Sequence, residues 1–219
     1  MQDFSHIRKH AELFLGKQRS RTQPKTSIVQ NRIKPTAAAP NGPPTRMREP
    51  IILLSPSASS LLRMQNVKTF LDAGIYQPAD STSGASNILH VSRLLPSIDP
   101  QRPLRFILVD SADQFKPDYW NRVVAVFTTG QLWQFKGYLW QSPPELFSHA
   151  LGIYVGWRGE DVPSTVKGWG RGVMGTQIDK YNPNQGAQAR WRDREVVEGI
   201  WTAIEESMRS KGWGKEAVR

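Results

Sequence analysis

The chain has 219 residues, no Cys, and 29 Lys and Arg against 19 Asp and Glu, which gives a formal net charge of +10. The lack of Cys excludes disulfide frameworks, thiolate zinc sites, iron–sulfur clusters and a Cys nucleophile. No apolar run approaches the roughly 20 residues that span a bilayer, and residues 1–15 contain no continuous apolar segment typical of a secretory signal. We therefore expect an intracellular, soluble, basic protein with no membrane partner.

The positive charge is concentrated at the start of the chain. Residues 1–48 contain ten Lys or Arg and two acidic residues, a balance of +8, whereas all eight Trp lie at Trp120 or later. Residues 1–16 place five apolar side chains on one helical face and predict a short amphipathic helix. These side chains are Phe4, Ile7, Ala11, Phe14 and Leu15. A mitochondrial presequence is the rival interpretation, and Asp3 and Glu12 count against it.

Residues 17–49 are rich in Pro, Ser, Thr, Gln and basic side chains. Such a segment cannot bury enough apolar surface to offset the cost of ordering its backbone, about 1–2 kcal/mol per residue. We expect a disordered, basic, Pro-rich linker. Its cluster from Lys17 to Lys25 is consistent with a nuclear localisation signal, a weak phosphate contact with nucleic acid, or a solubilising linker. Residues 213–219 are expected to form a flexible tail.

Five segments of the remaining chain have the pattern of strands. A continuous apolar run favours a buried strand, and strict alternation favours a half-buried one. The apolar run at residues 104–109 is expected to be central. The five segments are residues 51–54, 87–95 and 104–109, and the alternating sets Ile153, Val155, Trp157 and Met174, Thr176, Ile178.

Four segments have a helical pattern. The first places Leu61, Met64, Val67 and Leu71 on one face, with Ser57 or Ser59 as its cap and Gly74 at its end. The second is predicted from Tyr119 to Thr129, with Pro117 in its first turn, Gly130 after it and a core face of Trp120, Val123, Val124 and Phe127. The others are residues 143–150 and a long amphipathic helix over residues 187–210, which Gly212 closes.

Strands that alternate with helices predict a mainly parallel sheet with both faces covered. The order strand, loop, helix, strand, strand, helix is that of small GTPase-like folds. We therefore expect an α/β, Ras-like, three-layer α/β/α domain over residues 50–212, preceded by the disordered basic tail. A fold of this kind offers a ligand crevice at the carboxyl ends of its strands.

The residues at that crevice do not have the chemistry of nucleotide binding. A phosphate-binding loop needs Gly and Lys, and Ser55–Ser60 contains neither, so the domain is predicted to lack a P-loop. Asp113 stands where a GTPase needs a Gly, and we expect Asp110 and Asp113 to satisfy loop amides and not to bind a metal. No catalytic, cofactor-binding or metal-binding residue is predicted.

Two further features have an ordinary structural interpretation. Gly170, Gly172 and Gly175 match G-x-G-x-x-G, but they precede a predicted strand and do not follow one, so we expect a loop. His90 and His149 have no nucleophile-elbow motif beside them. The aromatic segment from Gly130 to Trp140 is expected to pack on the core under a long loop, with a peptide-binding or base-stacking platform as the alternative.

Two segments are similar to a known family. Residues 50–80 (PIILLSPSASSLLRMQNVKTFLDAGIYQPAD) and 117–140 (PDYWNRVVAVFTTGQLWQFKGYLW) resemble the parafibromin C-terminal domain family, and the pattern VVAVF…WQFKG at Val123–Gly137 is the most specific part. The resemblance covers about residues 50–212. It implies a Ras-like domain that has lost nucleotide binding, in a nuclear subunit of the PAF complex, which associates with RNA polymerase II.

The resemblance implies a non-catalytic protein-interaction domain that acts in transcription elongation. The expected partners are PAF complex subunits, RNA polymerase II through its phosphorylated tail, and nucleosomes or chromatin, with weak nucleic-acid contact through the basic tail. An acidic, phosphorylated partner suits basic side chains. The predicted partner-binding residues are Arg93, Arg102, Arg105, Lys116, Arg122, Trp133 and Lys136. The alternative function is that of a cryptic or degenerate GTPase-like nucleotide-binding protein.

Overall fold

The computed structural model describes residues 48–79 and 86–214. Contacts divide the chain into Met1–Thr45 and a compact unit, Arg46–Arg219, and the description below concerns the second unit alone. The helix predicted for residues 1–16 lies outside the described residues, as do residues 17–47 of the predicted linker and residues 215–219. No helix in the described ranges is both long and apolar enough to cross a membrane.

One six-stranded sheet forms the centre of this unit, with the strand order β2-β3-β1-β4-β5-β6. All neighbouring pairs are parallel except β2 with β3. The strands are β1 (Ile51–Leu53), β2 (Leu89–Leu95), β3 (Asp99–Val109), β4 (Val123–Thr128), β5 (Leu151–Trp157) and β6 (Val173–Ile178). The prediction of a mainly parallel sheet is confirmed, and the predicted strand at residues 104–109 lies inside the sheet.

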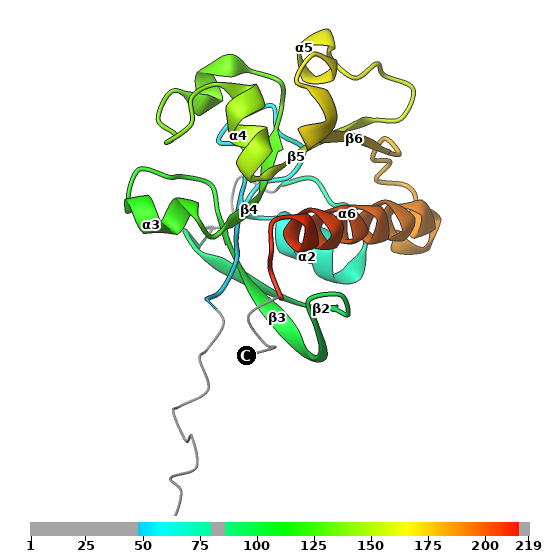
Figure 1. Ribbon diagram of the computed structural model, residues 1–219. Helices are drawn as coiled ribbons and strands as arrows, with labels where there is room; N and C mark the ends of the chain where they lie inside the picture. The colour runs from blue at the N-terminus through cyan, green and yellow to red at the C-terminus, as the bar shows by residue number, and fades with distance from the viewer. Residues whose placement is uncertain (1–47, 80–85, 215–219) are drawn as a thin grey trace, which may run out of the picture. The chain divides into compact units, whose positions relative to one another are not determined.

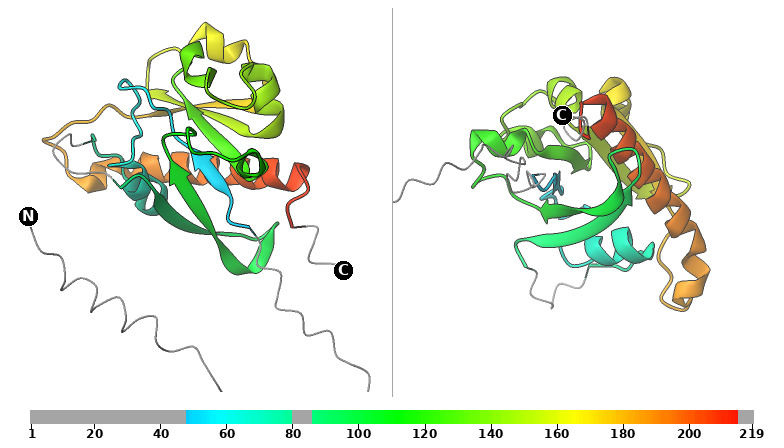
Figure 2. Two further views of the ribbon diagram at one scale, coloured as in Figure 1. Left: turned by 90° about the vertical axis from the view of Figure 1, so that its left-hand side faces the viewer. Right: turned by 60° about the horizontal axis from the view of Figure 1, so that its bottom comes forward.

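Helices and short turns cover both faces of the sheet. Figures 1 and 2 show α2 and α6 on one face and α3 and α4 on the other, so the predicted three layers are present. These elements are α2 (Val67–Ala73), α3 (Pro117–Trp120), η1 (Leu132–Phe135), α4 (Pro143–His149), α5 (Ser164–Lys167), η2 (Gly170–Gly172), η3 (Ala187–Arg190) and α6 (Trp191–Ser210).

Helix α6 forms because its apolar residues recur at helical spacing. Val197, Ile200, Trp201, Ile204 and Met208 are all buried against the sheet. The Trp201 indole N–H also donates to the Leu71 carbonyl at 3.2 Å, which ties α6 to α2. Fully burying an apolar side chain contributes about 1.5–3 kcal/mol, so this stripe supplies much of the stability of the α2/α6 face. The predicted long helix is confirmed.

The predicted helix from Tyr119 to Thr129 is wrong. Only Pro117–Trp120 is helical, and Val123–Thr128 is β4, a fully buried strand at the centre of the sheet. A continuous apolar run satisfies helical and strand spacing equally, and β-branched side chains favour the strand. The register shifts between Ile51 and Ile52, so Val124 and Ala125 both face the α2/α6 core.

The prediction that Ser57 or Ser59 caps the first helix is also wrong, because that helix begins only at Val67. The Asn66 side chain accepts from the Arg63 N–H at 2.8 Å and donates to the carbonyls of Leu61 and Gln77. These bonds hold the preceding residues in a turn outside the helix. The prediction that this helix ends at Gly74 is confirmed, since Gly74 adopts the left-handed conformation with φ +67°.

The end of the described chain returns to the body. Gly212 follows α6 with φ +90°, which fits its predicted role of closing the helix. Trp213, which the sequence suggests is part of a tail, is half-buried against the α2/α6 core, and its N–H donates to the Met208 carbonyl at 3.1 Å. Side-chain packing therefore continues at least to this residue.

Candidate functional site

The carboxyl ends of the parallel strands form the edge where a Ras-like fold would hold its ligand. The loop from Ser55 to Ser60 follows β1, and the turn that leads into η1 follows β4. Two amide side chains, Gln131 from this turn and Gln134 from η1, bond to the serine loop. The Ser57 hydroxyl donates to Gln131 Oε1 at 2.9 Å, and the Ser55 hydroxyl donates to Gln134 Oε1 at 3.2 Å. The two loops are therefore joined across the edge.

The backbone of the serine loop has its own acceptors. The N–H groups of Ser57 and Ser59 donate to the hydroxyls of Ser55 and Ser57, each at 3.3 Å. The Ser60 N–H donates to the Ser57 carbonyl at 3.0 Å. A phosphate-binding loop works by presenting free N–H groups to the anion. These three N–H groups already donate to acceptors within the loop, so they are not free to bind a phosphate. We call this arrangement the closed serine loop.

Gln134 is the buried centre of this arrangement. Its amide donates to the Phe127 carbonyl at 2.8 Å and to the Tyr138 hydroxyl at 3.4 Å. Burial raises the pKa of Tyr138 to about 12, and the hydrogen bond with Gln134 opposes that shift. The sequence did not identify Gln131 or Gln134. The two glutamines are three residues apart, a spacing that places side chains on the same side of a helical turn. This spacing does not indicate that they bond to the serine loop.

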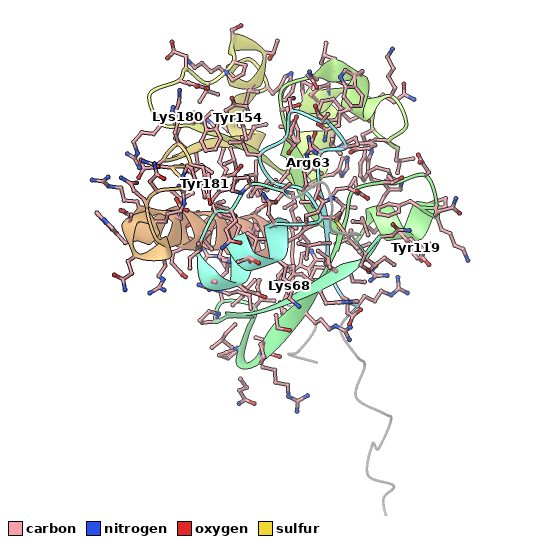
Figure 3. All side chains as sticks on the ribbon, turned by 180° about the vertical axis from the view of Figure 1, so that it is seen from behind. Arg63, Lys68, Tyr119, Tyr154, Lys180 and Tyr181 are labelled. Atoms are coloured by element: carbon pink, nitrogen blue, oxygen red, sulfur yellow. The ribbon has the colours of Figure 1, made fainter. Side chains whose placement is uncertain are left out.

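A hollow of about 220 Å³ remains beside this edge, smaller than the 300–1,000 Å³ of common ligand pockets. Its wall includes Thr129, Tyr154 and Glu160. Lys180 pairs with Glu160 at 2.9 Å, and Figure 3 shows Lys180 and Tyr154 at this edge. Burial, and secondly the charge of Glu160, raise the pKa of Tyr154. The charged groups at the hollow therefore neutralise each other.

The other residues weighed for chemistry occupy ordinary positions. Asp110 and Asp113 are exposed, and no group of three or more metal-ligating side chains occurs among the described residues. The His149 ring stacks on Trp140 with a centroid distance of 4.0 Å. A Cβ on Gly172 would lie 2.4 Å from the Phe147 carbonyl oxygen, so close packing explains this glycine of the G-x-G-x-x-G match.

The aromatic segment after β4 has two sides. Phe135 and Tyr138 are buried and pack with Trp120 and α4, as the core-packing interpretation predicts. Leu132, Trp133 and Leu139 are about half exposed, which this interpretation does not account for. The buried side of the segment packs against α3, because the ring of Trp120 contacts both Tyr138 and Trp140.

We call the exposed apolar and basic side chains of this segment, together with those that flank α3, the α3–η1 surface. It consists of apolar and basic side chains on the face of the sheet opposite α6, on the side of α3 and α4 in Figure 1. Its residues are Lys116, Arg122, Leu132, Trp133, Lys136 and Leu139. Arg122 is half-buried, and its guanidinium lies 5.6 Å from the Tyr119 ring centroid.

The seven predicted partner-binding residues do not form one cluster. Lys116, Arg122, Trp133 and Lys136 belong to the α3–η1 surface. Glu49 links Arg105 to Arg122. Its carboxylate pairs with Arg105 at 3.6 Å, and its backbone carbonyl accepts a hydrogen bond from the Arg122 side chain at 2.8 Å.

The remaining two lie elsewhere. Arg102 is exposed near the β2–β3 turn, where its N–H donates to Asp99. Arg93 points to the α6 face, where it pairs with Glu198 and stands over the Trp201 ring. The structure therefore joins Arg105 and Arg122 through Glu49 before the start of β4, places Trp133 beside Gln131 beyond the end of β4, and separates Arg93 and Arg102 from both.

Comparison with known proteins gives consistent relatives. The family model "RNA pol II accessory factor, Cdc73 family, C-terminal" matches residues 46–207. Cell division control protein 73 of Saccharomyces cerevisiae is 36% identical over 96% of this chain and 52% of its own length, and its namesake in Schizosaccharomyces pombe is 40% identical over 76% and 44%. The chain thus spans about half the length of these relatives.

A solved structure supports the same relationship. The conserved domain of yeast Cdc73 superposes with a TM-score of 0.66 and 38% identity, over 75% of this chain and 99% of that domain. The resemblance inferred from the sequence is confirmed, and so is the Ras-like α/β fold.

Proposed function

The chain belongs to the Cdc73 family of RNA polymerase II accessory factors, and from this premise we propose that residues 48–214 form a non-catalytic protein-interaction domain. The domain would act within a PAF-complex subunit in the nucleus, during transcription elongation. The observation that carries the proposal is the closed serine loop, in which Gln131 and Gln134 hold the positions where phosphate contacts would form. Function is then left to the outer surface.

The α3–η1 surface has the composition of a partner-binding site. Exposed Trp and Arg side chains dominate the binding energy of many interfaces, and Leu132, Trp133 and Leu139 supply apolar area. Lys116, Arg122 and Lys136 are the basic side chains of the same surface. Basic side chains form strong, charge-assisted hydrogen bonds with phosphate groups. The phosphorylated tail of RNA polymerase II is the partner that suits this combination, and chromatin and the other PAF subunits are further proposed partners.

Affinity purification with mass spectrometry tests the proposal. The full chain, tagged and expressed in its native cells, should recover PAF subunits and RNA polymerase II. The double variant Trp133→Ala/Lys136→Ala should recover polymerase at least tenfold less well. Trp191→Ala/Arg192→Ala is the matched control, because it removes an exposed Trp and a basic residue from the start of α6. Equal losses for both variants, or no polymerase with the unaltered chain, would refute the proposal.

The degenerate GTPase is the alternative, and the closed loop opposes it. Equilibrium dialysis of the full chain with GTP and magnesium separates the two functions. We expect no binding up to millimolar GTP, because the backbone donors of the serine loop are already used. Micromolar binding would revive the alternative.

The contribution of the basic tail is measured separately. Binding of the full chain to DNA should fall when residues 1–48 are deleted, and the salt dependence of the remaining binding should become shallow, because the tail carries +8 of the net charge. An unchanged slope would assign the phosphate contacts to the folded domain.

A further inference from the structure

Among residues 48–79 and 86–214, strand β2 has an open edge and an open face. It forms one edge of the sheet, and β3 is the only strand that pairs with it among the described residues. Val91 and Leu95 point into the α2/α6 core. The alternate residues therefore point to the opposite face. No residue of β2 contributes to the buried aromatic layer under α3 and α4, so that layer ends before it reaches β2.

The open face of β2 is apolar at both ends. Ile88, which directly precedes β2, is 52% exposed and Leu94 is 47% exposed, with His90 and Ser92 between them. Edge strands usually avoid association through Lys, Pro or inward-pointing charges. β2 contains neither Lys nor Pro, and its one charged residue, Arg93, is held on the other face by Glu198. The edge therefore lacks the usual protection.

We propose that this edge pairs antiparallel with β2 of a second copy of the chain. In the register centred on Val91, Ile88 faces Leu94 of the second copy and His90 faces Ser92. Both apolar ends then meet apolar partners, and Val91 faces its own counterpart. On the other side Arg93, already paired with Glu198, faces Leu89, so no like charges meet. Directly opposite side chains are the unit of stabilisation in sheets.

The neighbouring register is less favourable. Centred on Ser92, it would place Ile88 opposite Pro96, which cannot donate a ladder hydrogen bond. It would also place His90 opposite Leu94. The self-complementarity of the Val91-centred register is what favours a second copy of this chain over an unrelated strand. A seam of seven residues is shorter than a standard interface, so the dimer should be weak and depend on concentration.

Cysteine crosslinking tests the register, because the natural chain has no Cys. The full chain with Ile88→Cys and Leu94→Cys should form covalent dimers with a short bis-maleimide. Each single variant should form no covalent dimer, because the same residue in the two copies lies six residues apart along the seam, a distance of about 20 Å. These single variants are the matched controls. Absence of dimers from the double variant, or equal dimers from a single variant, would overturn the proposed pairing.

Sedimentation equilibrium provides a second readout. The unaltered chain should shift toward dimer with rising concentration, and Ile88→Lys and Leu94→Glu should each stay monomeric with an unchanged circular dichroism spectrum. Mixing these two variants should restore dimers, because the introduced lysine then faces the introduced glutamate, while the remaining Leu94 of one copy faces Ile88 of the other. An unaltered chain that stays monomeric at several hundred micromolar would overturn the proposal and leave the edge to a strand from another protein. This result is independent of polymerase binding.

Discussion

The two faces of the sheet are built in different ways. The α2/α6 face uses one long amphipathic helix whose stripe is almost fully buried, with apolar side chains from all six strands beneath it. The α3/η1/α4 face uses short turns, clustered aromatic rings and the buried amide of Gln134, and it leaves Leu132, Trp133 and Leu139 exposed. The comparison teaches that one face is closed by a buried helical stripe while the other leaves apolar side chains exposed, which is the separation of stability from recognition that the proposed function requires.

The largest expected effect comes from a buried ion pair on the α6 side. Asp193 is fully buried, and its carboxylate accepts from Arg190 and from the Tyr76 N–H at 2.8 Å. Asp193→Ala should reduce the free energy of unfolding by about 3–5 kcal/mol, because it leaves the Arg190 charge buried without a carboxylate partner. Urea denaturation measures this loss. Glu195→Ala, an exposed position on the same helix, is the control and should change stability by less than about 0.5 kcal/mol. Similar values for the two variants would contradict this account.

The next effect belongs to the aromatic face and depends on pH. Burial raises the pKa of Tyr138 from 10.0 to about 12. Its stabilising contribution is therefore fully present below pH 10 and is lost as the pH rises through about 12. Two pKa units correspond to about 2.7 kcal/mol.

Tyr138→Phe is the variant that isolates this effect. Unfolding measured between about pH 8 and 12 should show a steeper loss of stability for the unaltered chain than for the variant. The pKa values of Tyr76 and Tyr154 are also raised, but those residues are present in both proteins and cancel in the difference. Parallel curves would show that the Tyr138 hydroxyl is not buried in solution.

A smaller loss is expected at the closed edge. Gln134→Leu keeps the volume but removes the partners of the Ser55 hydroxyl and the Phe127 carbonyl, and it should cost about 1–3 kcal/mol. Gln131→Leu is the control, since Gln131 is exposed and its loss should cost less. If Gln134→Leu proved neutral, the idea that this amide holds the serine loop closed would fail.

The smallest expected effect on stability is at Trp133. Its side chain is 47% exposed, and its indole N–H reaches only the exposed Gln131. Trp133→Ala should change the free energy of unfolding by less than about 0.5 kcal/mol while reducing polymerase recovery. A large destabilisation would mean that Trp133 belongs to the core, and the division between the two faces would then be lost.

Much of the α2/α6 face could be predicted from the sequence, because α6 has strong helical spacing and β5 and β6 alternate. β4 could not, since six consecutive buried residues satisfy both helical and strand spacing. The absence of a phosphate loop was predictable from its missing Gly and Lys. The closing role of Gln131 and Gln134 was not, because it depends on side chains 74 and 79 residues away along the chain.

The distribution of the predicted basic residues shows the same limit. Arg93 and Arg105 lie on adjacent strands, yet one points to α6 and the other to Glu49. Composition identified both as cations, but only the register of β2 with β3 determines the face on which each lies.

One titration tests the division of labour most directly. The full chain is titrated with a phosphorylated polymerase-tail peptide, followed by fluorescence anisotropy, alongside Trp133→Ala/Lys136→Ala on the α3–η1 surface and Thr129→Ala/Tyr154→Phe at the crevice. Our account predicts at least a tenfold weaker affinity for the surface variant and an unchanged affinity for the crevice variant. Loss of binding in the crevice variant with full binding by the surface variant would contradict it.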